Sequence, residues 1–185
     1  VRQKLDGFVV PLTDEHMSEY VGAYAQRLAW LTGFQGSAGS AVVLPQEAAI
    51  FVDGRYTLQV ESQVDVAQFS PQHLTQRPPA AWLAETLLNG AKLGYDPWLI
   101  TLDGLARLEA GCVRAGATMV PVEGNPIDAV WDGQPAAPIS PAVPHGVEFA
   151  GIEAAAKRIA VAEVLAERKI DAVVLSAPDS IAWLL

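Results

Sequence analysis

The sequence contains a single cysteine and little positive charge, and these two shortages exclude several classes of protein. Cys112 cannot form an internal disulfide, and a lone thiol is typical of a reducing compartment, so we expect a cytoplasmic protein. The sequence has only 12 Lys and Arg residues but 21 Asp and Glu residues, which gives a net charge of −9. The basic residues are scattered singly along the sequence. A basic surface for nucleic acid or for anionic lipid is therefore not expected.

Long apolar runs are also missing. No run of about 18 apolar residues is present, which argues against a membrane-spanning helix. Residues 1–6 contain no apolar signal-peptide stretch and no initiating Met, so we expect the sequence to begin inside a longer chain. Hydrophobic residues nevertheless make up 51% of the sequence, which is enough for a sizeable core in one ordinary domain with some residues to spare.

Groups of residues that could perform catalysis are scarce. His16, His73 and His145 lie far apart and share no metal-ligand spacing, and the acidic residues around His16 are interpreted as a solvated loop. Residues 36–40, Gly-Ser-Ala-Gly-Ser, match neither a nucleophile elbow nor a phosphate-binding loop. Cys112 falls in a helical pattern and is expected to be a core or boundary residue. We therefore predict no catalytic residue and no metal ligand in this chain.

What the sequence does contain is an alternation of strand and helix patterns. Residues 45–47 form a tight connection between two apolar runs, which predicts a β-hairpin. Together these patterns predict an α/β domain, with a mixed β-sheet flanked by helices, over residues 1–132. The predicted strands are 7–12, 40–44, 48–52, 65–69, 92–95 and 118–122, and the predicted helices are 27–31, 56–64, 80–88 and 101–115.

The composition changes after this domain. Prolines recur between residues 133 and 144, which is typical of an extended spacer, and we predict a Pro-rich linker over residues 133–150. A helix over 152–168, a strand over 171–175 and a helix from 176 are predicted next. These elements do not bury a core of their own, so residues 151–185 are interpreted as the truncated start of a second domain.

One short motif follows the predicted strand 48–52 directly, namely Asp53-Gly54-Arg55-Tyr56. Strand ends are where α/β folds present functional groups. Asp53 is placed to cap the helix that begins near Arg55. The guanidinium of Arg55 is a planar, permanently charged fork that can bind a carboxylate or a carbonyl oxygen. On spacing alone, Arg55 is interpreted as a surface or ion-pair arginine.

Several segments resemble, in order along the chain, consecutive signatures of the N-terminal domains of Xaa-Pro aminopeptidases. Each segment alone is a weak signal, whereas their order along nearly the whole sequence is a strong one. The resemblance implies a creatinase/prolidase-like N-terminal domain, then the start of a second domain of similar fold. The segments are 15–21, 27–34, 36–39, 51–56, 93–98, 125–131 and 176–185.

The same resemblance implies a function. The family removes the N-terminal residue that precedes proline, with two metal ions, commonly manganese, in a C-terminal catalytic domain that is absent from this chain. It implies that the chain is an inactive N-terminal piece of such an enzyme, which is a homodimer, and that the piece contributes to substrate positioning and assembly. The family's Asp-Gly-Arg-Tyr arginine contacts bound substrate or inhibitor, which implies a substrate-binding role for Arg55. Trp30, Gly33, Gly36 and Gly39 are then expected to shape the loop beneath Arg55.

Two alternatives remain at this point. A prolidase or creatinase relative would share the architecture but not the Asp-Gly-Arg-Tyr and Gly-Ser-Ala-Gly motifs together. A stand-alone binding or dimerisation module would lack any catalytic domain. The length of the native gene product would distinguish such a module from the N-terminal part of a longer enzyme.

Overall fold

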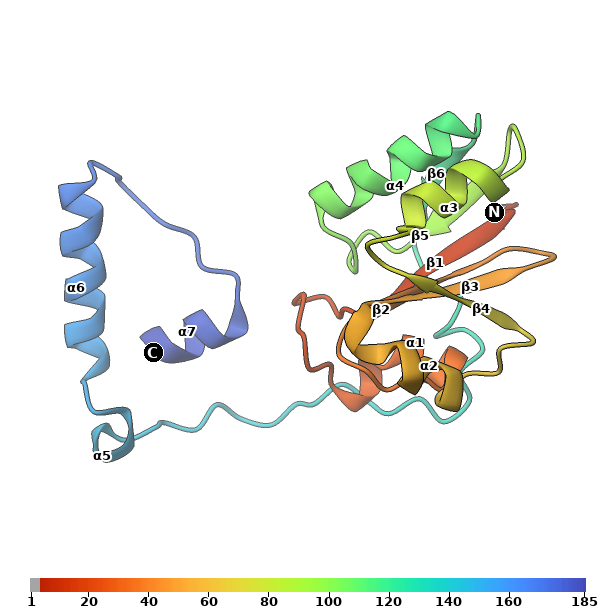
Figure 1. Ribbon diagram of the computed structural model, residues 1–185. Helices are drawn as coiled ribbons and strands as arrows, with labels where there is room; N and C mark the ends of the chain where they lie inside the picture. Colours follow the sequence, from red (N-terminus) through yellow and green to blue (C-terminus); the bar gives the residue numbers. More distant parts are fainter. Residues whose placement is uncertain (1–3) are drawn as a thin grey trace. The chain divides into compact units, whose positions relative to one another are not determined.

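The structure is a computed structural model that describes residues 4–185. It divides into two compact units, one that ends at residue 137 and one that begins at residue 138, and each unit is described by itself (Figure 1). No helix in the described part of the chain is both long and apolar enough to cross a membrane.

The first unit is built on a 6-stranded sheet in the order β4-β3-β2-β1-β5-β6. β2 pairs antiparallel with β1 and β3, whereas the other neighbours are parallel, so the predicted mixed sheet is confirmed. The predicted hairpin is the β2–β3 pair, and its turn is closed by a 2.8 Å hydrogen bond from Leu44 N–H to the carbonyl of Glu47. The strands are β1 (Gly7–Pro11), β2 (Gly39–Val43), β3 (Ala48–Val52), β4 (Phe69–His73), β5 (Lys92–Tyr95) and β6 (Thr118–Pro121).

One strand of the sheet lies later in the sequence than predicted. The prediction was 65–69, but β4 begins at Phe69. Asp65 forms a turn instead, because its carbonyl accepts from the N–H groups of Gln68 and Phe69, both at 2.9 Å, and its carboxylate accepts from Ala67 N–H at 3.0 Å. This local bonding of an aspartate to its own backbone competes with strand pairing.

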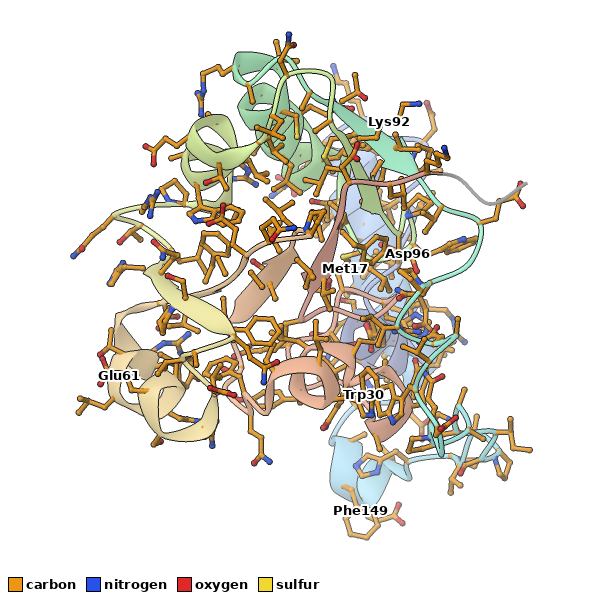
Figure 2. All side chains as sticks on the ribbon, turned by 90° about the vertical axis from the view of Figure 1, so that its right-hand side faces the viewer. Met17, Trp30, Glu61, Lys92, Asp96 and Phe149 are labelled. Carbon is orange, nitrogen blue, oxygen red and sulfur yellow. The ribbon has the colours of Figure 1, made fainter. Side chains whose placement is uncertain are left out.

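Helices cover both faces of this sheet. α1 (Arg27–Thr32) and α2 (Thr57–Gln63) lie on one face, and α3 (Pro79–Thr86) and α4 (Leu102–Arg114) lie on the other (Figure 1). The short 3-10 helices η1 (Ala23–Ala25) and η2 (Gly54–Tyr56) precede α1 and α2. In Figure 2, Trp30 on α1 and Glu61 on α2 mark the same side of the sheet.

The core follows the period of two that strands impose on their side chains. In β3, Ile50 faces the layer of α1 and α2, and its neighbour Phe51 faces α3 and α4. Phe51 meets Trp82 of α3 edge-on, with 5.9 Å between ring centroids. The apolar run of β3 is thus buried on both faces, which is why it reads as continuous rather than alternating.

Cys112 of α4 lies in this core, as expected, with no exposed surface and with its Sγ 3.4 Å from the Sδ of Met119 in β6. Burial raises the pKa of the thiol to about 11. The thiolate is the reactive form, so the native chain should react with a thiol reagent at pH 8 at least about 100-fold more slowly than the denatured chain. Equal labelling rates in a time course with and without denaturant would contradict the packing described here.

The second unit contains α5 (Val147–Ala150), α6 (Ala154–Glu167) and α7 (Pro178–Leu184). The predicted helices 152–168 and from 176 are present in shortened form. Residues 147–150 are helical rather than extended, although they lie within the predicted linker. The predicted strand 171–175 is wrong, because these residues have no regular structure and pair with no strand in the part of the chain described.

Candidate functional site

The Asp53-Gly54-Arg55-Tyr56 motif lies at the carboxyl end of β3. β3 and β4 are parallel, with Val52 opposite His73, so their carboxyl ends share one edge of the sheet. The carboxylate of Asp53 caps η2 by accepting from Arg55 N–H at 2.9 Å, which confirms the predicted cap. A Cβ on Gly54 would lie 3.3 Å from His73 Nε2, so the backbone passes close to that ring.

The side chain of Arg55 forms an ion pair with Asp53, the residue that caps η2, the short helix in which Arg55 lies. Nε lies 3.1 Å from both carboxylate oxygens, and Nη2 lies 2.7 Å from Oδ2. These hydrogen bonds lower the pKa of Asp53 and raise that of Arg55. The Arg55 side chain is still 64% exposed, against 27% for Asp53. Arg55 is therefore the ion-pair arginine that its spacing suggested, and it also presents charge to solvent.

Tyr56 supports the guanidinium from a second direction. Its ring centroid lies 5.1 Å from Cζ of Arg55, within the range of a cation–π contact. The ring is fixed in turn by an edge-on contact with Phe34 at 5.5 Å, and its hydroxyl lies 2.8 Å from Oγ of Ser37. The hydrogen bond with Ser37 lowers the pKa of Tyr56. The Gly-Ser-Ala-Gly segment is thereby connected to the arginine motif.

Two glycines near this motif are required for different reasons, one by its backbone conformation and one by close packing. Gly33 has a φ of 81°, a left-handed conformation that ends α1, and its N–H donates to the carbonyl of Ala29. A Cβ on Gly36 would collide with Phe34 and lie 2.9 Å from Cδ1 of Tyr56. Gly36 is therefore a neighbour of the arginine motif, in line with the expectation. Trp30 instead stacks on Trp131, with 5.5 Å between centroids, and joins α1 to the segment after β6.

A surface cavity of about 390 Å³ adjoins this group through Ser37. Its apolar lining includes Leu28 and Phe34, and its one acidic residue is Glu19. The Ser37 hydroxyl lies 3.4 Å from a carboxylate oxygen of Glu19. The cavity therefore offers apolar contact and a single negative charge next to Ser37, whose hydroxyl contacts Tyr56 beneath the Arg55 guanidinium.

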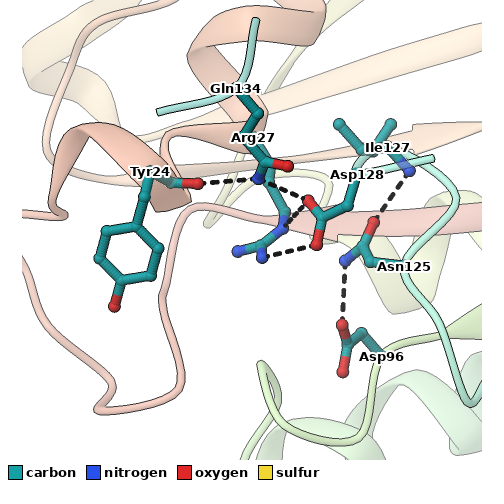
Figure 3. A network of polar contacts seen from close by, with 7 residues as sticks. All are labelled: Tyr24, Arg27, Asp96, Asn125, Ile127, Asp128 and Gln134. Carbon is teal, nitrogen blue, oxygen red and sulfur yellow. Dashed lines mark hydrogen bonds and ion pairs between the residues drawn. The ribbon is translucent and has the colours of Figure 1, made fainter. Parts of the chain in front are cut away.

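A second network of polar contacts, centred on Arg27 and Asp128, stabilises the fold, and the sequence did not predict these contacts (Figure 3). Nε and Nη2 of Arg27 donate to the carboxylate of Asp128 at 2.7 and 2.8 Å, and this pairing raises the pKa of Arg27. Gln134 donates to the same carboxylate and to the carbonyl of Tyr24, both at 2.9 Å. The Arg27 side chain is only 10% exposed. These contacts hold the segment after β6 against α1, and they do not present charge to a ligand.

The same segment is fixed by Asn125. Its amide donates to Asp96 at 3.0 Å, and its carbonyl oxygen accepts from Ile127 N–H at 3.0 Å (Figure 3). Asn125 and Asp128 lie in segment 125–131, one of those that resemble the family. The structure shows that hydrogen bonds attach this segment to the rest of the first unit.

The three histidines of the sequence do not come together in a metal site. His16 lies 3.8 Å from Glu15, His73 contacts Thr75, and His145 packs on Phe149 in the second unit. Within residues 4–185, no group of at least three His, Cys, Asp or Glu side chains could hold a metal ion. The described residues therefore do not fit a two-metal centre.

Comparison with known proteins agrees with this fold. A family model of the creatinase/prolidase N-terminal domain matches residues 1–130, and a second model of the same description matches residues 133–185. The chain therefore belongs to the creatinase/prolidase N-terminal domain family.

Several proteins that match nearly the whole chain are Xaa-Pro aminopeptidases. The chain is 36% identical over 98% of its length to an Xaa-Pro aminopeptidase of Drosophila melanogaster, and 34% identical over 98% to human Xaa-Pro aminopeptidase 2. The solved structure of X-prolyl aminopeptidase from Caenorhabditis elegans, described as a cytosolic enzyme with a di-nuclear active site, matches 98% of the chain with 32% identity and a TM-score of 0.86. The chain spans 30%, 27% and 30% of these proteins, respectively.

Proposed function

We propose that this chain is the N-terminal, non-catalytic part of a metal-dependent Xaa-Pro aminopeptidase, which removes the N-terminal residue preceding proline from a peptide. The relatives that match nearly the whole chain at 32–36% identity are Xaa-Pro aminopeptidases, which favours this function over that of a prolidase or creatinase. The chain's own contribution is to position substrate and to support assembly of a homodimer.

The observation that carries this proposal is the state of Arg55. Its guanidinium is fixed by Asp53 and Tyr56, yet most of its side chain faces solvent. A fixed guanidinium donates well-directed hydrogen bonds to a peptide carbonyl or carboxylate, and such bonds are stronger than neutral ones. Holding a peptide in a reactive geometry accelerates a reaction without any bond-breaking by the group that holds it.

The bond-breaking chemistry is assigned to the remainder of the proposed full-length protein. Two divalent ions, manganese in our proposal, would activate water and polarise the scissile carbonyl there. The described residues offer no ligand set for them. The di-nuclear, cytosolic description of the Caenorhabditis elegans relative supports two metal ions and a cytoplasmic location.

Replacing Arg55 by alanine in the full-length protein tests the role of this chain. We expect kcat/KM for an Xaa-Pro peptide with manganese to fall roughly 10- to 100-fold, the range for losing charge-assisted hydrogen bonds. The matched control is Arg107→Ala, which removes an exposed arginine from α4 on the other face of the sheet. A kcat/KM that is unchanged in Arg55→Ala would leave the domain with assembly as its role.

A further inference from the structure

We propose that Asp53 is a positioning residue, which fixes the orientation in which the Arg55 guanidinium meets the peptide substrate. This inference rests on the proposed function of Arg55.

The carboxylate of Asp53 is itself anchored, so it can hold the arginine rather than follow it. Oδ1 accepts from the backbone N–H of Arg55 at 2.9 Å, which fixes the carboxylate at the start of η2. The same carboxylate then accepts from Nε at 3.1 Å and from Nη2 at 2.7 Å. An exposed arginine without such a partner would occupy many rotamers, and ordering it on binding would cost entropy.

The contacts of Asp53 and Tyr56 leave a defined part of the guanidinium available. Nε and one N–H of Nη2 are directed at Asp53, and the Tyr56 ring lies 5.1 Å from Cζ. Arginine has five N–H donors, so both N–H groups of Nη1 and the outer N–H of Nη2 are left over. Among the residues that the structure describes, no hydrogen bond from Nη1 of Arg55 is formed. The ligand class that this edge suits is an acceptor oxygen of a peptide, either a carbonyl or a carboxylate.

The variant that isolates this role is Asp53→Ser in the full-length protein. Serine is as good an N-cap residue as aspartate, so it retains the cap of η2, but its hydroxyl is too short to bridge the guanidinium. We expect KM for an Xaa-Pro peptide to rise about three- to tenfold while kcat changes less than about twofold, because the loss is one of preorganised binding. Asp53→Asn, which keeps the shape but not the charge, should give an intermediate KM.

The double variant Asp53→Ser with Arg55→Ala makes the test specific. If Asp53 acts through Arg55, the serine substitution should change KM no further once Arg55 is alanine. Asp103→Ser is the matched control, because it removes an exposed carboxylate from the first turn of α4, and it should leave KM unchanged.

The possible results separate the two proposals. If Arg55→Ala lowers kcat/KM but Asp53→Ser leaves KM unchanged, the positioning role is wrong and the function of Arg55 stands. The positioning role is equally wrong if the effect of Asp53→Ser persists undiminished in the Arg55→Ala background. If Arg55→Ala has no effect, the substrate-positioning role of Arg55 and the positioning role of Asp53 are both wrong, and assembly is left as the role of the domain.

Discussion

Asp128→Ala is expected to lower the free energy of unfolding of this chain by about 3 kcal/mol. The substitution leaves the guanidinium of Arg27 buried without its ion-pair partner, and breaking one side of a buried pair costs about 3–5 kcal/mol. The lower end applies because the Asp128 side chain is 34% exposed, whereas that of Arg27 is 10% exposed. Nη1 of Arg27 is already buried without a hydrogen-bond partner among residues 4–185, so the remaining charge has little to compensate it.

Urea unfolding of the variants would measure this loss. The pair Arg77–Glu85 is the matched control, since its Nη2–Oε2 distance is also 2.7 Å but its side chains are 43% and 59% exposed. Glu85→Ala should therefore cost no more than about 1 kcal/mol. Arg27→Met combined with Asp128→Ala should be less destabilised than Asp128→Ala alone, because no unpaired charge is then buried. An Asp128→Ala cost as small as that of Glu85→Ala would contradict the assignment of a buried pair.

Gly111→Ala is the second substitution with a large expected effect, about 2–3 kcal/mol of destabilisation. Gly111 lies where α4 packs on α3, and a Cβ there would collide with the carbonyl oxygen of Ala80 and lie 2.8 Å from its Cα. These are backbone atoms, so the two helices must separate rather than a side chain rotate. The gain in helix propensity, about 1 kcal/mol, offsets only part of this cost.

The same substitution at Gly104 of α4 provides the control. A Cβ at Gly104 would meet only side-chain atoms, Oγ1 of Thr101 at 3.2 Å and Cγ2 of Ile100 at 3.3 Å. Gly104→Ala should therefore leave the unfolding free energy within about 1 kcal/mol of the original, or raise it. Equal effects of the two substitutions in thermal unfolding would mean that the helix contact at Gly111 is not tight.

The fold of the first unit could be predicted because its signals are local. The β2–β3 hairpin, the left-handed glycine that ends α1 and the proline start of α3 each depend on a few neighbouring residues. The failures have two causes, one that depends on strand pairing far along the chain and one that is a local turn. Residues 171–175 have a strand composition, but within residues 4–185 no strand pairs with them. Asp65 instead bonds to the backbone of the residues just after it, where a strand was expected.

The candidate site could be predicted in part for the same reason. The capping role of Asp53 follows from its place before a helix, whereas the ligand role of Arg55 came only from the family resemblance and remains a proposal. The contact of Ser37 with Tyr56 joins residues 19 positions apart, and that of Arg27 with Asp128 joins residues 101 positions apart. No spacing rule in the sequence reports such contacts, because they depend on how the sheet brings its loops together.

In the proposed function, this domain positions substrate but breaks no bond. The most direct measurement is peptidase activity on an Xaa-Pro peptide with manganese, for the 185-residue chain alone beside the full-length gene product. We predict no turnover above buffer from the chain alone and metal-dependent turnover from the full-length protein. Metal-dependent turnover by the purified chain alone would contradict the proposed non-catalytic role.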